Sequence, residues 1–176
     1  MITRELLVAA ALLTLNLGQG DQALSAPVDP WRSLSFLEGT WEARTQAGSA
    51  GAQVDGTYTF KLELKHHVLA RHSAPAACKG PEAFNCEHSD LLYVYQDAVG
   101  QPLKAIYMDN EGHVIHYAVS TPNSTTAIFV SESSPSSPRF QLIYELKGAV
   151  MSGKFQMRMP GKADWKSYLE WSGTKK

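Results

Sequence analysis

The sequence predicts an all-β protein, a single antiparallel meander β-barrel of about ten strands with a short N-terminal helical turn. Three observations predict this fold. Short runs rich in β-branched and aromatic residues recur along the chain, turn residues separate them, and no long stretch carries the 3.6-residue period of a helix. Several of these runs alternate between apolar and polar side chains, so each strand has one wet face and one apolar face.

The first 26 residues have the pattern of a secretory signal peptide. Arg4 gives a positive start, residues 6–17 are almost wholly apolar, and Ser25 and Ala26 are small residues suited to cleavage. This apolar run is too short to span a bilayer, which takes about 20 residues. We therefore expect an exported protein, periplasmic or secreted, with no membrane span and one domain over residues 27–176. A short buried helix is the alternative for this segment.

The domain begins with one helical turn over residues 31–39, where Trp31, Leu34 and Leu37 fall on one face. Turn residues divide the rest of the chain into ten predicted strands, at residues 40–45, 53–64, 67–73, 90–96, 103–109, 113–120, 126–131, 139–146, 151–159 and 165–172. Ten strands that share one apolar face can hide it by closing on themselves, which also removes the sheet edges. Two packed sheets are the alternative.

Alternation predicts which side chains face the barrel interior. The clearest sets are Tyr58, Phe60, Leu62 and Leu64; Phe140, Leu142, Tyr144 and Leu146; Met151, Phe155, Met157 and Met159; and Trp165, Leu169 and Trp171. A barrel of eight or more strands is wide enough to hold a small ligand. Methionine adapts to irregular ligands, so this inner face suits an apolar molecule.

Residues 109–113 (DNEGH) are predicted to form a three-residue hairpin loop. Asp109 suits the first position of a type I turn, and Gly112 suits the left-handed position that follows. This register puts Asp109 opposite His113. It also pairs Tyr107 with Ile115, Ala105 with Tyr117 and Leu103 with Val119. This face is the more aromatic one, so we place it inside the barrel.

The candidate ligand-binding residues follow from these faces: Tyr107, Tyr117, His113, Asp109, Phe155 and Met157. A carboxylate beside a histidine raises the histidine pKa and fixes the ring, so Asp109 and His113 can orient a ligand or act as an acid–base couple. The alternative is a cross-strand polar pair that stabilises the hairpin by a few tenths of a kcal/mol. No catalytic residue is assigned.

The two cysteines, Cys78 and Cys86, lie in a stretch rich in turn-forming residues. In an exported chain such a pair predicts a disulfide. A metal site that adds His88 is the alternative, but it would need more ligands at closer spacing. Among the other histidines near this stretch, the adjacent His66 and His67 point to opposite faces of a strand and cannot easily share an ion, and His67 and His72 also differ in strand parity. We predict no metal and no cofactor.

The amino-acid composition excludes some classes of binding partner. The chain is 44% hydrophobic and 19% charged, which is globular, and beyond residue 26 it has 15 basic and 15 acidic residues. A neutral chain without a Lys/Arg cluster lacks the charge that nucleic acid or an anionic membrane surface attracts. The expected partner is a small apolar molecule, and the expected state is a monomer or homodimer.

Residues 36–41 (FLEGTW) resemble the Gly-x-Trp signature that opens lipocalins, fatty-acid-binding proteins and nitrobindin-like barrels, the calycin group. The resemblance implies that Trp41 plugs the closed end of the barrel and that Gly39 permits close backbone packing. Residues 105–119 (AIYMDNEGHVIHYAV) add to a similarity with lipocalin-like domains of exported bacterial proteins. The similarity covers the whole domain in architecture and these two segments in sequence.

Two functional motifs of these relatives are not matched. Fatty-acid-binding proteins hold a carboxylate with an Arg-x-Tyr pair on the last strand, where this chain has Lys166 and Tyr168, both predicted to face solvent. Nitrobindin-like proteins bind haem through a histidine near the C-terminal end, but no histidine follows His116. Neither carboxylate binding nor haem binding is therefore implied.

Three functions remain, in order of preference. The first is an exported barrel that binds or carries a small, mostly apolar ligand. The second is a filled barrel that acts through its outer surface, as an inhibitor or envelope factor. The third is a barrel enzyme, an isomerase or hydrolase, that uses His113, Asp109 and a tyrosine. An enzyme is thus not the leading expectation, and fold alone does not decide among the three.

Overall fold

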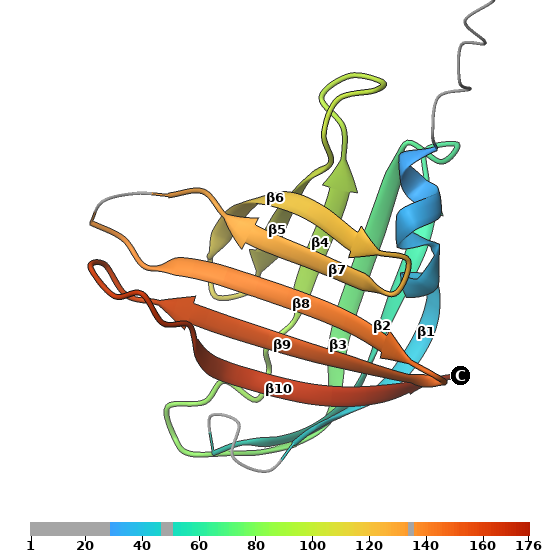
Figure 1. The fold of residues 1–176 in the computed structure, drawn as a ribbon. Coiled ribbons are helices and arrows are strands. Elements are labelled where there is room, and N and C mark those ends of the chain that lie inside the picture. Colours follow the sequence, from blue (N-terminus) through green and yellow to red (C-terminus); the bar gives the residue numbers. More distant parts are fainter. Residues whose placement is uncertain (1–28, 47–50, 134–135) are drawn as a thin grey trace, which may run out of the picture.

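The computed structural model describes residues 29–46, 51–133 and 136–176, which form a closed antiparallel barrel (Figure 1). Neighbouring strands follow chain order, and the first strand pairs with the last to close the barrel. The strands are β1 (Gly39–Thr45), β2 (Gln53–Glu63), β3 (Val68–Lys79), β4 (Asp90–Tyr95), β5 (Lys104–Asp109), β6 (Val114–Asn123), β7 (Thr126–Ser131), β8 (Arg139–Lys147), β9 (Val150–Arg158) and β10 (Lys166–Lys175). The predicted all-β barrel of about ten strands is confirmed, and the alternative of two packed sheets is wrong.

Two predicted strand ends are wrong, for local reasons. The second strand stops at Glu63 because Leu64 and the next two residues take positive φ angles in a turn. Leu64, predicted to face the interior, is instead 73% exposed. The third strand continues beyond residue 73 to Lys79, because a β-bulge between Asp55 and Gly56 keeps it paired with the start of β2.

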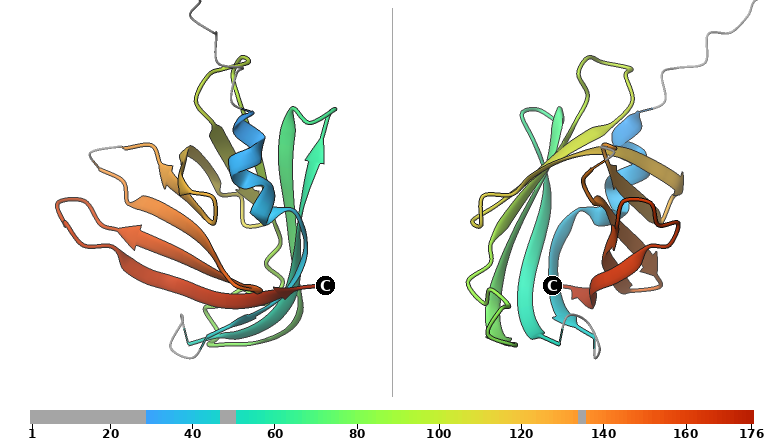
Figure 2. Two further views of the ribbon diagram at one scale, coloured as in Figure 1. Left: turned by 45° about the vertical axis from the view of Figure 1, so that its right-hand side comes forward. Right: turned by 90° about the vertical axis from the view of Figure 1, so that its left-hand side faces the viewer.

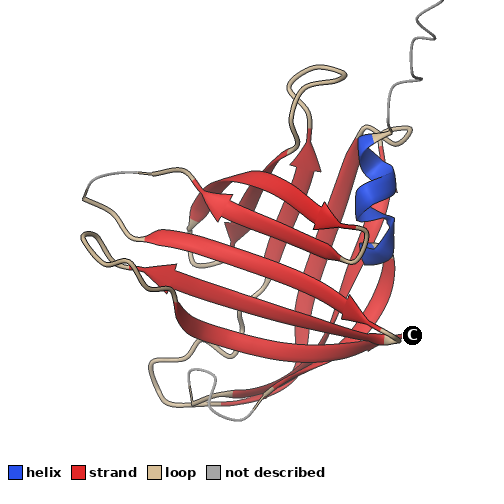
Figure 3. Ribbon diagram, viewed as in Figure 1, coloured by secondary structure: helices blue, strands red, loops and turns tan. Residues whose placement is uncertain are grey.

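The one helix of the described residues is the short 3-10 helix η1 (Pro30–Leu37), close to the predicted helical turn (Figure 3). It begins where the Asp29 side chain accepts a hydrogen bond from the Trp31 amide, at 3.0 Å. Its buried face carries Leu34 and Leu37, which belong to the barrel core. The helix lies at the end of the barrel where β1 begins (Figure 2).

Trp41 joins this helix to the barrel. Its side chain is 2% exposed, and its indole N–H donates to the carbonyl of Leu37 at 2.8 Å. Just before it, Gly39 has a φ of 112°, a conformation that residues with a Cβ rarely adopt. The Gly-x-Trp segment therefore turns the chain from η1 into β1 and fills this end of the barrel, which we call the closed end.

Because consecutive strands run in opposite directions, every second connection between strands lies at the opposite end of the barrel. That end, the open end, gathers the loop that follows β3 and the hairpin between β5 and β6 (Figure 1). The core clusters in the other half, around the fully buried side chains Trp41, Phe60, Leu69, Phe129, Tyr144 and Met151. The two halves of the barrel interior are thus filled differently.

The predicted signal peptide, residues 1–26, lies outside the described residues, and its assignment stays a prediction. Within the described ranges, no helix has the length and apolar character needed to cross a bilayer.

Candidate functional site

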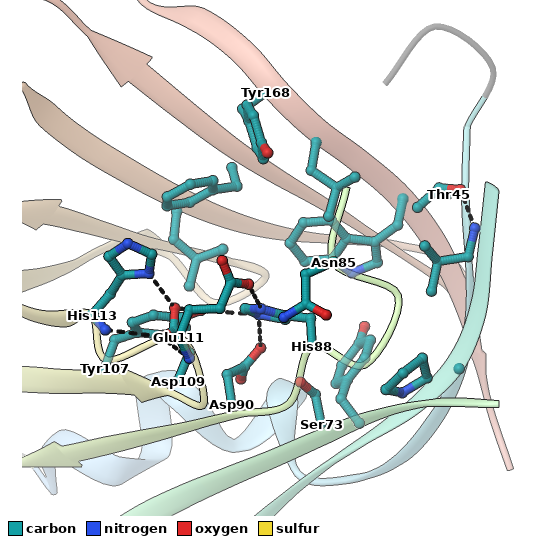
Figure 4. A pocket seen from close by; sticks show the side chains of 18 of the residues that line it. Thr45, Ser73, Asn85, His88, Asp90, Tyr107, Asp109, Glu111, His113 and Tyr168 are labelled. Carbon is teal, nitrogen blue, oxygen red and sulfur yellow. Dashed lines mark hydrogen bonds and ion pairs between the residues drawn. The ribbon is translucent and has the colours of Figure 1, made fainter. Parts of the chain in front are cut away.

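A cavity of about 660 Å³ occupies the open end of the barrel (Figure 4). It exists because the inward positions become small toward this end. Ala43 follows Trp41 on β1, Gly56 precedes Tyr58 on β2, and Ser73 follows Arg71 on β3. The apolar part of the wall is made by Phe140, Leu142, Phe155, Met157 and Trp171. Its size and mostly apolar wall are those of a small-molecule site.

All six candidate ligand-binding residues line this cavity: Tyr107, Tyr117, His113, Asp109, Phe155 and Met157. The predicted hairpin register is the one observed. Tyr107 pairs with Ile115, Ala105 pairs with Tyr117, and the Asp109 amide donates to the His113 carbonyl at 3.3 Å. The register accounts for their shared face. That these residues bind a ligand stays a prediction.

The Asp109 carboxylate accepts several hydrogen bonds that stabilise the β5–β6 hairpin at the cavity rim. Its Oδ1 accepts hydrogen bonds from the amides of Glu111 and His113, at 3.0 and 2.9 Å. Its Oδ2 accepts from the Tyr107 hydroxyl at 3.1 Å and lies 2.9 Å from His113 Nδ1. Burial alone would raise the pKa of Asp109, but the hydrogen bonds from His113, Tyr107 and Glu111 lower it. The carboxylate therefore holds the hairpin turn and also orients the His113 ring.

A buried ion pair that the sequence analysis missed lies deeper in the cavity wall. The guanidinium of Arg71, on β3, donates to the Asp90 carboxylate at the start of β4 and to the Tyr144 hydroxyl. Arg71 is 5% exposed. Burial would raise the pKa of Asp90, but the Arg71 charge and hydrogen bonds from His88, Ser73 and Arg71 lower it to about 2. Both groups are therefore charged at neutral pH.

The signal for this pair was present in the sequence. Arg71 has the same strand parity as the buried Leu69, and Asp90 has the parity of the buried Leu92. A charged residue in phase with core residues on each of two neighbouring strands predicts an internal ion pair.

His88 connects the ion pair to the rim. Its Nδ1 lies 2.8 Å from Glu111 Oε1, and its Nε2 lies 3.4 Å from Asp90 Oδ2 and 3.1 Å from the Tyr107 hydroxyl (Figure 4). The hydrogen bond to Asp90, partly opposed by burial and helped by Glu111, raises the pKa of His88 to about 9. The ring is therefore an imidazolium at neutral pH, with a carboxylate at each nitrogen.

The loop between β3 and β4 closes part of the cavity. Cys78 and Cys86 lie at disulfide distance, with their Sγ atoms 2.01 Å apart. Phe84 and Asn85, between them, line the cavity. The loop is held against the β5–β6 hairpin by His88 and by Asn110, whose side-chain N–H donates to the Glu87 carbonyl at 2.8 Å. The two cysteines are thus paired as predicted, and their pairing holds the loop that forms part of the cavity wall.

Two polar atoms of cavity-lining residues are buried without a hydrogen-bond partner, the hydroxyl of Tyr117 and Nε of Arg71, while the buried Tyr58 hydroxyl has the Trp171 side chain as its partner. Burial raises the pKa of Tyr117, so its hydroxyl stays protonated. An unpaired buried polar group costs about 1–3 kcal/mol, and native proteins rarely leave one unless a ligand or solvent molecule pairs with it.

Two predicted orientations near the C-terminus are wrong, and a third is wrong in part. Tyr168, predicted to face solvent and not the cavity, is 49% exposed but also lines the cavity, where a bulge between Ser167 and Leu169 turns this part of β10. Its ring packs edge-on against Phe155, with centroids 6.1 Å apart. Trp165, predicted inside, is not part of the cavity wall, and the Arg158 guanidinium lies 4.8 Å from its ring centre. Met159, also predicted inside, is 48% exposed beyond the end of β9.

Other histidines do not join the site. His66, His67 and His72 are exposed. Among the residues that the structure describes, no three His, Cys, Asp or Glu side chains are arranged to hold a metal ion.

A scan of the sequence against protein-family models and a search of curated proteins found no match. The fold and the cavity are therefore the grounds on which a function can be argued. A closed ten-strand antiparallel barrel with a helix at one end is compatible with a calycin-like fold.

Proposed function

We propose that this protein is an exported, lipocalin-like carrier that binds a small, mostly apolar molecule inside its barrel. The observation that supports this most is the cavity of about 660 Å³ at the open end. A barrel that acts only through its outer surface has no use for such a space, and close-packed interiors do not normally leave one. The cavity therefore favours the carrier over the filled-barrel alternative.

The apolar body of the ligand would pack against the aromatic and methionine side chains of β8, β9 and β10. Phe140 and Phe155 stack with their ring centroids 5.7 Å apart, and both line the cavity. Met157 lies beside them and can adjust to the shape of the ligand. Tyr107 and Tyr117 would present polar groups, and Asp109 and His113 would stand at the rim.

Features outside the cavity support export and the lipocalin-like relationship. The Gly39–Trp41 segment lies where the Gly-x-Trp signature of those barrels belongs, at the closed end. A disulfide between Cys78 and Cys86 suits an oxidising compartment. N-terminal sequencing of the protein from its native host would test export. We expect the mature chain to begin near residue 27.

Native mass spectrometry of the protein from its exporting host tests ligand binding. We expect a co-purifying molecule of about a few hundred daltons, the size that such a cavity accepts. A thermal unfolding series with retinoids and medium-chain alcohols is the complement, because a ligand that binds only the folded state raises the melting temperature. A bare protein whose melting temperature none of these molecules shifts would contradict the carrier function.

A barrel enzyme is the second candidate because of one contact. His113 Nδ1 lies 2.9 Å from Asp109 Oδ2, while the ring itself is 63% exposed at the cavity mouth. An oriented, accessible imidazole is a suitable general base. The test is conversion of the co-purified molecule by the wild-type protein and its loss in His113→Ala. Equal turnover by the two proteins would remove this candidate.

A further inference from the structure

The charged side chains of the cavity wall are already paired within the protein. Arg71 is bound to Asp90, His88 lies between Asp90 and Glu111, and His113 is held by Asp109. Farther out on β1, Arg44 is paired with Asp55. Every charged group of the cavity wall therefore already has a counter-ion within the protein, and none is free to pair with a charged ligand.

The balance of these charges is unfavourable for an anion. From the buried part of the cavity to its rim, three carboxylates face one guanidinium and two histidine rings: Asp90, Asp109 and Glu111 face Arg71, His88 and His113. Even with both rings protonated, this wall has no surplus positive charge. A ligand carboxylate would lose its hydration here without gaining a free cation.

Besides Nε of Arg71, whose charge is paired with Asp90, one buried cavity-lining hydrogen-bonding group remains free. The hydroxyl of Tyr117 is buried and has no hydrogen-bond partner. Tyr117 is 2% exposed, and its ring lines the cavity. A phenol can donate one hydrogen bond and accept another, so it suits a hydroxyl, carbonyl or amide group of a ligand.

We propose that the cavity recognises an uncharged polar group, an alcohol, ketone or amide, on an otherwise apolar molecule, and rejects the carboxylate of the same skeleton. This inference rests on the proposed carrier function and specifies its ligand class. Tyr117 is the specificity residue that bonds the polar group, and Asp90 is the residue that excludes an anion by occupying Arg71.

Two matched ligand sets test the inference on the wild-type protein at pH 7. The first is 1-decanol, decanamide and decanoate, each below its micelle concentration, and the second is retinol and retinoic acid. Binding is read from quenching of tryptophan fluorescence, since Trp171 lines the cavity, and from calorimetry. We expect the uncharged member of each set to bind at least about tenfold more tightly than the carboxylate.

The outcomes separate the inference from the carrier function. Carboxylates that bind as tightly as the uncharged molecules would overturn the inference and leave the carrier function standing. Failure of every probe in both sets, in titrations up to millimolar concentration, would overturn both proposals.

Asp90→Asn tests the excluding role directly. The change removes the counter-ion of Arg71, so we expect decanoate to bind about tenfold more tightly, while 1-decanol changes by less than threefold. Asp97→Asn is the matched control. It frees Lys104, a pair whose members both lie outside the cavity wall, and should leave decanoate binding unchanged. Equal effects of the two substitutions would contradict the role of Asp90.

Tyr117→Phe provides a test that does not disturb the ion pair. Its hydroxyl has no partner in the protein, so the variant should keep or slightly raise the melting temperature. Binding of decanamide should weaken about fivefold or more, and binding of decanoate should not. Tyr93→Phe, on a ring outside the cavity that packs against His72, is the control. Unchanged decanamide binding in Tyr117→Phe would overturn the assignment of that residue.

Discussion

The two ends of this barrel use the same strands for opposite purposes. At the closed end, the inward positions are large and fully buried: Trp41, Phe60, Leu69 and Tyr144 are each at most 2% exposed. At the open end, the same strands present Ala43, Gly56 and Ser73, and a cavity remains. A change of side-chain size along a strand, with no change of fold, therefore separates the stabilising half from the binding half.

The polar chemistry of the molecule follows this division. The Arg71–Asp90 pair lies where the filled half meets the cavity, and the histidines extend from it to the rim. Because Tyr144 belongs to the core and also accepts a hydrogen bond from Arg71, the packed half fixes the position of the guanidinium. The binding half is thus ordered by contacts with the half that does not bind.

Trp41→Ala and Phe155→Ala test the difference between the two ends. Trp41 fills the closed end, so its removal should lower the free energy of unfolding by about 4 kcal/mol. Phe155 already borders an empty space, so its removal should cost about 1–2 kcal/mol. Urea denaturation of both variants measures the two losses. Equal losses would show that the halves do not differ in packing.

Gly153→Ala tests how tightly the boundary is packed. A Cβ at this position would lie 2.0 Å from the Trp171 indole, so either the indole or the strand must move. We expect a loss of about 3 kcal/mol in the free energy of unfolding and a shift in tryptophan emission. The loss should shrink in a Trp171→Phe background, where the smaller ring leaves room. A Gly153→Ala loss that is unchanged in that background would assign the cost to the backbone instead.

Removal of the disulfide should weaken the open end. The double substitution Cys78→Ser/Cys86→Ser opens a short loop, and the chain-entropy relation gives a loss of about 2.5 kcal/mol. Hydrogen exchange should rise in this loop and in the β5–β6 hairpin it contacts, and should stay slow at the closed end. Faster exchange at both ends alike would mean that the two halves unfold as one.

The smallest expected effect is a pH dependence at the open end. The folded-state pKa of His88, about 9, is above its unfolded value of about 6.5, so its stabilisation is complete below pH 6.5 and is lost as pH rises through 9. With allowance for its partial exposure, the free energy of unfolding should fall by about 1–2 kcal/mol over this range. His88→Gln should remove this part of the slope. A slope that persists in the variant would assign it to another group.

Much of the barrel could be predicted from the sequence, because alternation in strands such as β2 and β8 is a direct record of which face is buried. The pairing of Tyr107 with Ile115 could also be predicted, since the turn chemistry of Asp109 and Gly112 sets the register. These features depend on residues close together in the chain.

What could not be predicted depends on long-range geometry. The bulge that turns Tyr168 onto the cavity arises where β9 and β10 fall out of step, and no local pattern marks it. The contact of Arg71 with Tyr144 crosses the barrel interior. It joins β3 to β8, which are far apart in the sequence and are not neighbours in the sheet. The volume of the cavity is the difference between the space that the ten strands enclose and the volume of the side chains that point into it. The inner face could therefore be predicted from the sequence, but the empty space could not.

The seam between β1 and β10 has a consequence for how the molecule folds. Trp41 pairs with Lys175, so the last hydrogen-bonded ladder joins the two ends of the domain. Loop-closure entropy makes such a contact slow to form, and we expect folding on the millisecond-to-second scale rather than in microseconds. Until the final strand docks, β1 and β9 both present open edges. The protein is then most prone to aggregation just before the barrel closes, and the docking of β10 onto β1 is the closing step of folding.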